Sequence, residues 1–124
     1  MRVVVPSMHP GGLDAAISPH LGHSDVFTVV DVSEREVKGV DVEPNIGLHF
    51  GGRMRPAYLV ANLKPDAVIA LGLGPRALAV LRGFGIRVLY AIGGTVRENV
   101  EAFLEGRLRP FSDEHVCRHP ERGF

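Results

Sequence analysis

The sequence predicts a single α/β domain built on a five-stranded mixed sheet with about three helices. The first half of the chain combines a β-branched segment with a hairpin pattern, and the second half alternates short strands with helices, as βαβ units do. The length of 124 residues suits one domain and leaves no room for a second core. We expect residues 1–110 to form this domain and residues 111–124 to be a polar, partly ordered C-terminal tail.

The first half contains three predicted strands and two long loops. Residues 2–6 are a β-branched run that ends in proline, which is typical of a buried strand. Residues 26–32 and 36–42 are rich in valine and are separated by a short polar turn, which predicts an antiparallel hairpin. The loops at residues 7–24 and 43–53 are rich in glycine and polar residues, so neither continues a strand or begins a helix.

The second half is more regular. Apolar spacing predicts a helix over residues 54–63 and a strand over 67–71. A second helix begins at Pro75, because proline is tolerated at the first helical position, and glycines end it near residue 83. Residues 86–90 form the next strand, and Thr95 with a glutamate three residues later has the pattern of a capping box for a third helix.

These elements imply one sheet topology. The strand–helix–strand unit over residues 67–90 must be a right-handed parallel crossover. If the first strand joins this set and the hairpin lies beside it, the strand order is 3-2-1-4-5 with only strand 2 reversed, the three-layer arrangement of ribonuclease-H-like folds. The loops after strands 1, 3, 4 and 5 then leave from one edge of the sheet. Ligands of open α/β sheets bind at this carboxyl edge.

Composition excludes several classes of protein. Basic and acidic residues both number 14, so the chain lacks the net positive charge of a non-specific nucleic-acid binder. The single cysteine cannot form an intrachain disulfide and fits a reducing compartment, so we expect a cytoplasmic protein. No apolar run suits a signal peptide or a membrane span. We therefore expect no nucleic-acid or membrane partner, and a monomer or weak homodimer.

Two glycine turns at the carboxyl edge are candidates for anion binding. Each places backbone N–H groups at a helix N-terminus, where the helix dipole favours negative charge. The alternative is that glycine is needed only for a sharp strand-to-helix turn. The residues concerned are Gly72, Gly74, Arg76, Gly93, Gly94 and Thr95.

Histidines in the long loops are candidate metal ligands. His20 and His23 are spaced closely enough to share a ligand, and His49 lies in the second long loop, followed by Arg53 and Arg55. Neutral imidazole suits zinc, copper, iron or nickel, although any single loop histidine is also explained as a solvated residue. In the tail, Cys117 stands between two histidines at alternate positions, so an extended segment would place all three on one side. A flexible tail pays ordering entropy to bind anything, which weighs against this set.

Catalytic patterns are weak. No serine lies in a G-x-S-x-G turn, and the first strand carries none of the carboxylates that a two-metal nuclease needs. This argues against an active enzyme of the ribonuclease H type. An enzyme or sensor that binds a small phosphorylated or carboxylated ligand, with a histidine as general base, stays open as an alternative. A partner-binding module without a ligand is a third.

Residues 18–27, S-P-H-L-G-H-S-D-V-F, are similar to a family element S-x-H-F-G-x-(A/S)-x-x-F, with Leu21 in place of phenylalanine. Further similarities cover Gly51-Gly52, residues 71–78, residues 85–91 and residues 94–108. In this ordered succession the chain resembles the dinitrogenase iron–molybdenum cofactor biosynthesis family, which includes NifX, NafY and the C-terminal part of NifB.

The resemblance implies a ribonuclease-H-like fold and a binding role without turnover. The expected ligand is an anionic iron–molybdenum cofactor precursor or another molybdenum-, copper- or iron-sulfur cluster, exchanged with cofactor donor or acceptor proteins. Some relatives bind a molybdenum–copper–sulfide cluster. The candidate binding residues are His20, Gly22, His23, His49, Gly51, Gly52, Arg53, Arg55, Gly72, Gly74, Arg76, Gly93, Gly94 and Thr95. His20, His23, His49 and Cys117 are the candidates for direct contact with metal.

Overall fold

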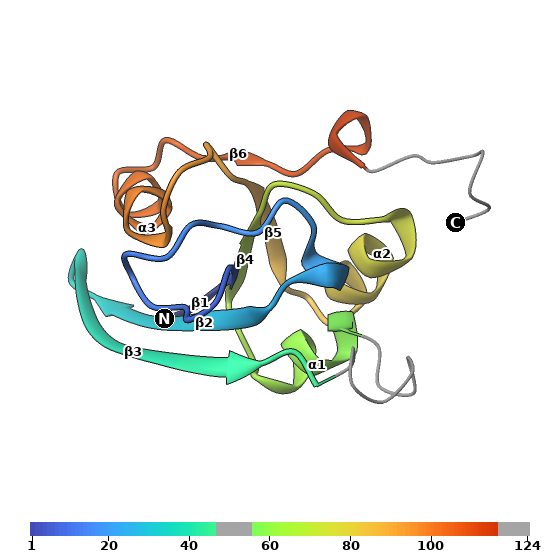
Figure 1. The fold of residues 1–124 in the computed structure, drawn as a ribbon. Helices are drawn as coiled ribbons and strands as arrows, with labels where there is room; N and C mark the ends of the chain where they lie inside the picture. The colour runs from blue at the N-terminus through green and yellow to red at the C-terminus, as the bar shows by residue number, and fades with distance from the viewer. Residues whose placement is uncertain (47–55, 117–124) are drawn as a thin grey trace.

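The computed structural model describes residues 1–46 and 56–116, and these form one open mixed sheet covered by helices on both faces (Figure 1). The strands are β1 (Arg2–Ser7), β2 (Val26–Ser33), β3 (Glu36–Pro44), β4 (Ala67–Ala70), β5 (Arg87–Tyr90) and β6 (Arg109–Pro110). The helices are α1 (Pro56–Asn62), α2 (Pro75–Gly83) and α3 (Val96–Leu104). Two 3-10 turns, η1 (Leu21–His23) and η2 (Asp113–His115), lie outside these elements.

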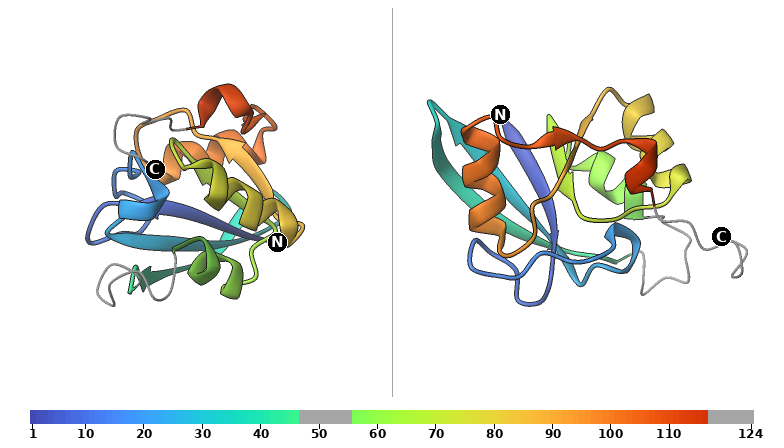
Figure 2. Two further views of the ribbon diagram at one scale, coloured as in Figure 1. Left: turned by 90° about the vertical axis from the view of Figure 1, so that its right-hand side faces the viewer. Right: turned by 90° about the horizontal axis from the view of Figure 1, so that it is seen from above.

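The strand order is β3-β2-β1-β4-β5-β6. β1 pairs antiparallel with β2 and parallel with β4, and β4 pairs parallel with β5. The predicted order of the first five strands, with only β2 reversed, is therefore confirmed. In the two turned views, α3 lies on one face of the sheet and α1 with α2 on the other, so the fold has three layers (Figure 2).

A sixth strand corrects the prediction of five. β6 pairs antiparallel with the end of β5, Tyr90 opposite Arg109 and Leu89 opposite Pro110. The next residue, Phe111, donates its N–H to the carbonyl of Val88 at 2.8 Å and is 1% exposed. The packed chain thus extends beyond the boundary expected at residue 110, since Phe111 anchors it to the core. The sequence did not indicate this because β6 is too short to show a periodic pattern.

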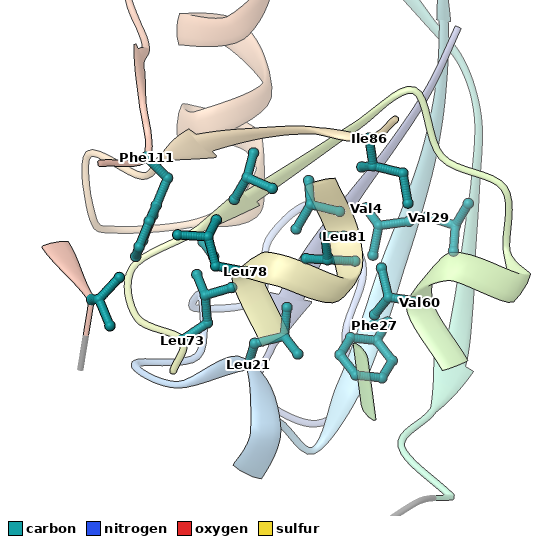
Figure 3. Close-up of a cluster of buried hydrophobic side chains, with 14 residues drawn as sticks. Val4, Leu21, Phe27, Val29, Val60, Leu73, Leu78, Leu81, Ile86 and Phe111 are labelled. Atoms are coloured by element: carbon teal, nitrogen blue, oxygen red, sulfur yellow. The ribbon is translucent and has the colours of Figure 1, made fainter. Parts of the chain in front are cut away.

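The core lies on both faces of the sheet because alternate residues of each strand point to opposite faces. On the first face, residues such as Val4, Phe27 and Val68 pack against Val60 of α1 and Leu81 of α2 (Figure 3). The second face packs against α3, and its main members are Val3, Val5, Ile69, Val96 and Val100. β1 is therefore apolar at successive positions because both of its faces are covered.

The caps that the sequence predicts for the helices are present. Pro75 is the first residue of α2, and the capping box of α3 has both of its hydrogen bonds. Thr95 Oγ1 accepts from the N–H of Glu98 at 3.2 Å, and a Glu98 carboxylate oxygen accepts from the N–H of Thr95 at 3.0 Å. No helix among the described residues is long and apolar enough to span a bilayer.

Candidate functional site

The first long loop ties together the glycine turns at the carboxyl edge of the sheet. The N–H of Leu21, in this loop, donates to the carbonyl of Gly72 at 2.9 Å, in the turn that precedes α2. The N–H of Ile17 donates to the carbonyl of Gly94 at 3.0 Å, in the turn that precedes α3. The loop therefore runs along the edge from one turn to the other, and the predicted convergence of these three segments is present in the structure.

The η1 turn brings His20 and His23 together. The two ring centroids lie 5.1 Å apart with an interplanar angle of 43°. His20 is the N-cap of the turn, and its Nδ1 accepts the N–H of Gly22 at 3.1 Å. Leu21, between them, is buried in the core, so the turn presents histidines outward while its centre is anchored inward.

The capping hydrogen bond determines which nitrogen of the neutral His20 ring carries the proton. Because Nδ1 accepts a backbone N–H, the neutral ring has its proton on Nε2. A metal ligand must offer a lone pair, and here the Nδ1 lone pair is already used within the turn. In this arrangement the proton is on Nε2, and direct metal ligation by His20 through Nδ1 would require the cap to open.

Two buried polar residues, Ser24 and Asn45, hold the η1 turn. Ser24 occupies the (A/S) position of the family element over residues 18–27, whereas no sequence motif indicates Asn45. Asn45, directly after β3, donates through Nδ2 to the carbonyls of Gly22 at 3.3 Å and Ser24 at 3.0 Å. Ser24 accepts the N–H of Ser7 at 2.8 Å through its Oγ, which also lies 2.6 Å from the carbonyl of Val26. These contacts connect the turn to the ends of three strands, so its position is fixed by the sheet.

Ser24→Ala should lower the free energy of unfolding by about 1–3 kcal/mol, because it leaves the buried N–H of Ser7 without its acceptor. Urea denaturation followed by circular dichroism measures this loss. Ser33→Ala, at the exposed end of β2, is the matched control and should change stability by less than about 0.5 kcal/mol. Equal losses in the two variants would show that the Ser24 contacts do not anchor the turn.

The N-terminus of α2 has backbone N–H groups that the described residues do not satisfy. Its N-cap, Gly74, has no side chain that could accept a hydrogen bond from the first N–H groups, and Pro75 has no N–H. The N–H groups of Arg76 and Ala77 have no acceptor among the described residues. Together with the helix dipole and the exposed Arg76 side chain, they favour an anion beside the histidine turn.

The N-terminus of α3 differs from the expectation. The N–H of Val96 donates to Ala15 at 2.9 Å, that of Arg97 to Leu13 at 2.8 Å, and that of Glu98 to Thr95. The Glu98 carboxylate also lies against Gly94, where it places negative charge. The first three amides of α3 therefore serve the fold and are not available to an anion. Gly93 and Gly94 are explained by their φ angles of 90° and 82°.

Part of the predicted set lies outside the described residues, and its role stays a prediction. These residues are His49, Gly51, Gly52, Arg53, Arg55 and Cys117. Within residues 1–46 and 56–116, no three histidine, cysteine, aspartate or glutamate side chains form a group that could hold a metal ion. The described donors, two imidazoles and the α2 amides, thus fit a ligand held by hydrogen bonds and charge better than one held in a closed coordination shell.

Fold and edge together define a small three-layer α/β binding domain with the topology of ribonuclease-H-like proteins. Residues 1–106 match the family described as dinitrogenase iron-molybdenum cofactor. The chain belongs to this family.

Individual relatives agree with this assignment. The uncharacterized protein MJ0580 of Methanocaldococcus jannaschii is 34% identical over 98 residues, which cover 77% of this chain and 82% of that protein. The apo form of the orange protein from Desulfovibrio gigas is 28% identical, with a TM-score of 0.77 over 90% of this chain and 92% of that one. The protein in the crystal structure of PH0822 is 27% identical, with a TM-score of 0.76 over 91% of this chain and 98% of that one.

Proposed function

We propose that this chain is a non-enzymatic binding or carrier protein for an anionic metal–sulfur cluster, of the iron–molybdenum type or a precursor of it. The cluster would bind at the carboxyl edge of the sheet, between the η1 turn and the start of α2. The observation that carries the proposal is the placement of the His20–His23 pair beside the N-terminus of α2, fixed by the hydrogen bond from Leu21 to Gly72. The first N–H groups of α2 lack acceptors among the described residues. Family membership over residues 1–106 supports the class of ligand.

The chemistry of this edge suits a cluster whose outer atoms are sulfide. Sulfides carry the negative charge of such a cluster and accept hydrogen bonds, and they fill most of the coordination positions of its metals. The Nε2–H tautomer of His20 and the N–H groups of Arg76 and Ala77 are donors, and the Arg76 guanidinium adds charge. Each contact is individually modest, so a ligand held this way can be released to an acceptor protein.

His23 has a different position from His20. Its side chain is exposed on the same turn, and its ring lies against that of His20. It is therefore the better placed of the two described histidines to offer a lone pair to an outer metal such as copper or iron. Residues 47–55 contribute His49, Arg53 and Arg55 to the proposal from the sequence alone.

The test is uptake of a synthetic cluster by the purified protein. Under anaerobic conditions the protein is titrated with tetrathiomolybdate and copper(I), and new charge-transfer absorption reports binding. His20→Ala and His23→Ala should each weaken uptake about tenfold, as expected for the loss of one hydrogen bond or ligand to a charged group. His9→Ala removes an exposed histidine from the same long loop and should leave uptake unchanged.

Two readings of this titration contradict the proposal. If the protein takes up no cluster, the edge does not bind this class of ligand. If His20→Ala and His23→Ala bind as tightly as the unmodified protein, the site lies elsewhere. Circular dichroism of each variant separates a lost contact from a lost fold.

A further inference from the structure

A hollow lies at the sheet edge, where β5 ends and the chain approaches β6. Its volume is about 460 Å³. Leu71, Ala91 and Ile92 supply the apolar lining. Ile92 lies outside the helices and strands, and its side chain is 52% exposed. An apolar side chain held half-exposed in a hollow offers a contact surface for the carbon body of a ligand.

One wall of the hollow is a stack of rings. The rings of Tyr90 and His115 lie parallel, with centroids 3.8 Å apart and an interplanar angle of 2°. The ring of Phe111 meets each of them edge-on, at 5.8 Å and 5.5 Å. The N–H of Ser112 donates to His115 Nδ1 at 3.1 Å and holds that ring in place. The wall is therefore formed before any ligand arrives, which lowers the entropic cost of binding.

Two arginines give the hollow its charge. Arg107 and Arg109 both line it. Glu105 contacts Arg107 at 2.6 Å, but this pair is exposed and solvent weakens it. Arg109 has no ion pair among the described residues, and no carboxylate lines the hollow there. A guanidinium in this setting matches the paired oxygens of a carboxylate or phosphate.

We propose that this hollow binds a small organic anion that carries a carboxylate or phosphate group on an apolar, planar body. Arg109, assisted by Arg107, would hold the acidic group, while Ile92 and the Tyr90–His115 wall would contact the body. Each feature of the hollow accounts for one part of this ligand. A bare inorganic ion would use only the arginines, and a neutral apolar molecule would leave both of them without a partner.

This site does not depend on cluster binding. Apart from Leu71, which follows β4, its lining comes from the end of β5 and the segment around β6. The proposed cluster site is formed instead by the η1 turn and the start of α2. The two proposals can therefore fail separately, provided that the experiment reads each of them.

The experiment uses phenyl phosphate, phthalate and inorganic phosphate as probes, with calorimetry for affinity and amide NMR shifts for location. At least one organic probe should bind at least about tenfold more tightly than inorganic phosphate, because only the organic probes have an apolar body. Binding should shift the amide signals of Ala91 and Ile92. The tighter of the two organic probes identifies the preferred acidic group.

Arg109→Gln should weaken binding of the organic probe at least about tenfold, since it removes the charge that pairs with the acidic group. Arg87→Gln is the matched control, because Arg87 is exposed at the opposite end of β5 and should not affect binding. Tetrathiomolybdate uptake by Arg109→Gln should be unchanged.

Three results would overturn the proposal. The first is the absence of saturable shifts at Ala91 and Ile92 with either organic probe. The second is equal affinity of Arg109→Gln and the unmodified protein. The third is a parallel loss of cluster uptake in Arg109→Gln, which would make the hollow part of the cluster site rather than a second one.

Discussion

Phe111→Ala is expected to lower the free energy of unfolding by about 3–5 kcal/mol, as large-to-small substitutions of fully buried aromatic residues do. Phe111 is 1% exposed and belongs to the core cluster that includes Leu78 and Leu81 of α2. Its ring also meets Tyr90 edge-on. The substitution removes this packing and leaves a cavity that the surrounding strands and helix fill only in part, so its cost exceeds that of transfer to water alone.

Urea denaturation of Phe111→Ala gives the loss directly. Phe84→Ala is the matched control, because Phe84 is 61% exposed and contacts Tyr58 only edge-on at 6.2 Å. This control should lose less than about 1 kcal/mol. If the two variants lost the same stability, the segment after β6 would not belong to the cooperative core.

The sequence predicts the fold well because the composition of β1 to β5 is typical of strands. Runs of valine mark β1 and β2, and alternating valines mark β3. The crossover rule fixes the parallel unit of β4 and β5, and placing β1 next to it with the hairpin outside completes the order. β6 has only two residues, an arginine and a proline. A strand of that length has no period to detect, and its place depends on Phe111 finding the core, which is a tertiary event.

The candidate site was predictable as a region but not as a set of atoms. Topology alone brings the loops after β1, β4 and β5 to one edge. Whether a helix N-terminus is open there depends on the path of the first loop, whose Leu13 and Ala15 carbonyls accept the α3 amides. Two glycine turns that look equivalent in sequence therefore differ, and the turn before α2 is the one whose following amides lack acceptors among the described residues.

The role of His20 shows the same limit. Its spacing from His23 predicts that the two rings are neighbours, which the centroid distance of 5.1 Å bears out. Spacing does not show that Nδ1 caps the η1 turn, and this contact is what assigns the proton to Nε2. Likewise Asn45 resembles an ordinary turn residue after Pro44, although it is buried and clamps two carbonyls of the histidine turn.

Asn99→Asp is expected to lower the free energy of unfolding by about 3–5 kcal/mol at neutral pH, the cost of an uncompensated buried charge. Asn99 is 0% exposed, and its Nδ2 donates to the carbonyls of Gly93 at 2.9 Å and Thr95 at 2.8 Å. Its Oδ1 accepts the N–H of Ile92 at 2.8 Å. A carboxylate keeps the contact with Ile92 but faces two carbonyl oxygens without a proton to donate.

One effect opposes this loss, because residue 99 is in the first turn of α3, where the helix dipole favours an acid. That effect is worth at most about 2 kcal/mol, so the buried charge decides the outcome. Burial and the two carbonyls raise the pKa of the introduced carboxyl above the unfolded value of about 3.9. The folded state therefore binds more protons, and the loss is small below about pH 4 and grows as the pH rises through the folded pKa.

Denaturation of Asn99→Asp at pH 4 and pH 7 separates these contributions, since protonation at the lower pH restores one donor to the turn between β5 and α3. The matched control is Asn62→Asp at the exposed end of α1, where a carboxylate stays in water and should cost less than about 1 kcal/mol at either pH. A loss in Asn99→Asp that does not change with pH would show that lost packing, rather than buried charge, controls this position. In that case Gly93 and Ile92 would be held by their own backbone geometry, and the fixed shape of this turn would not depend on the Asn99 amide.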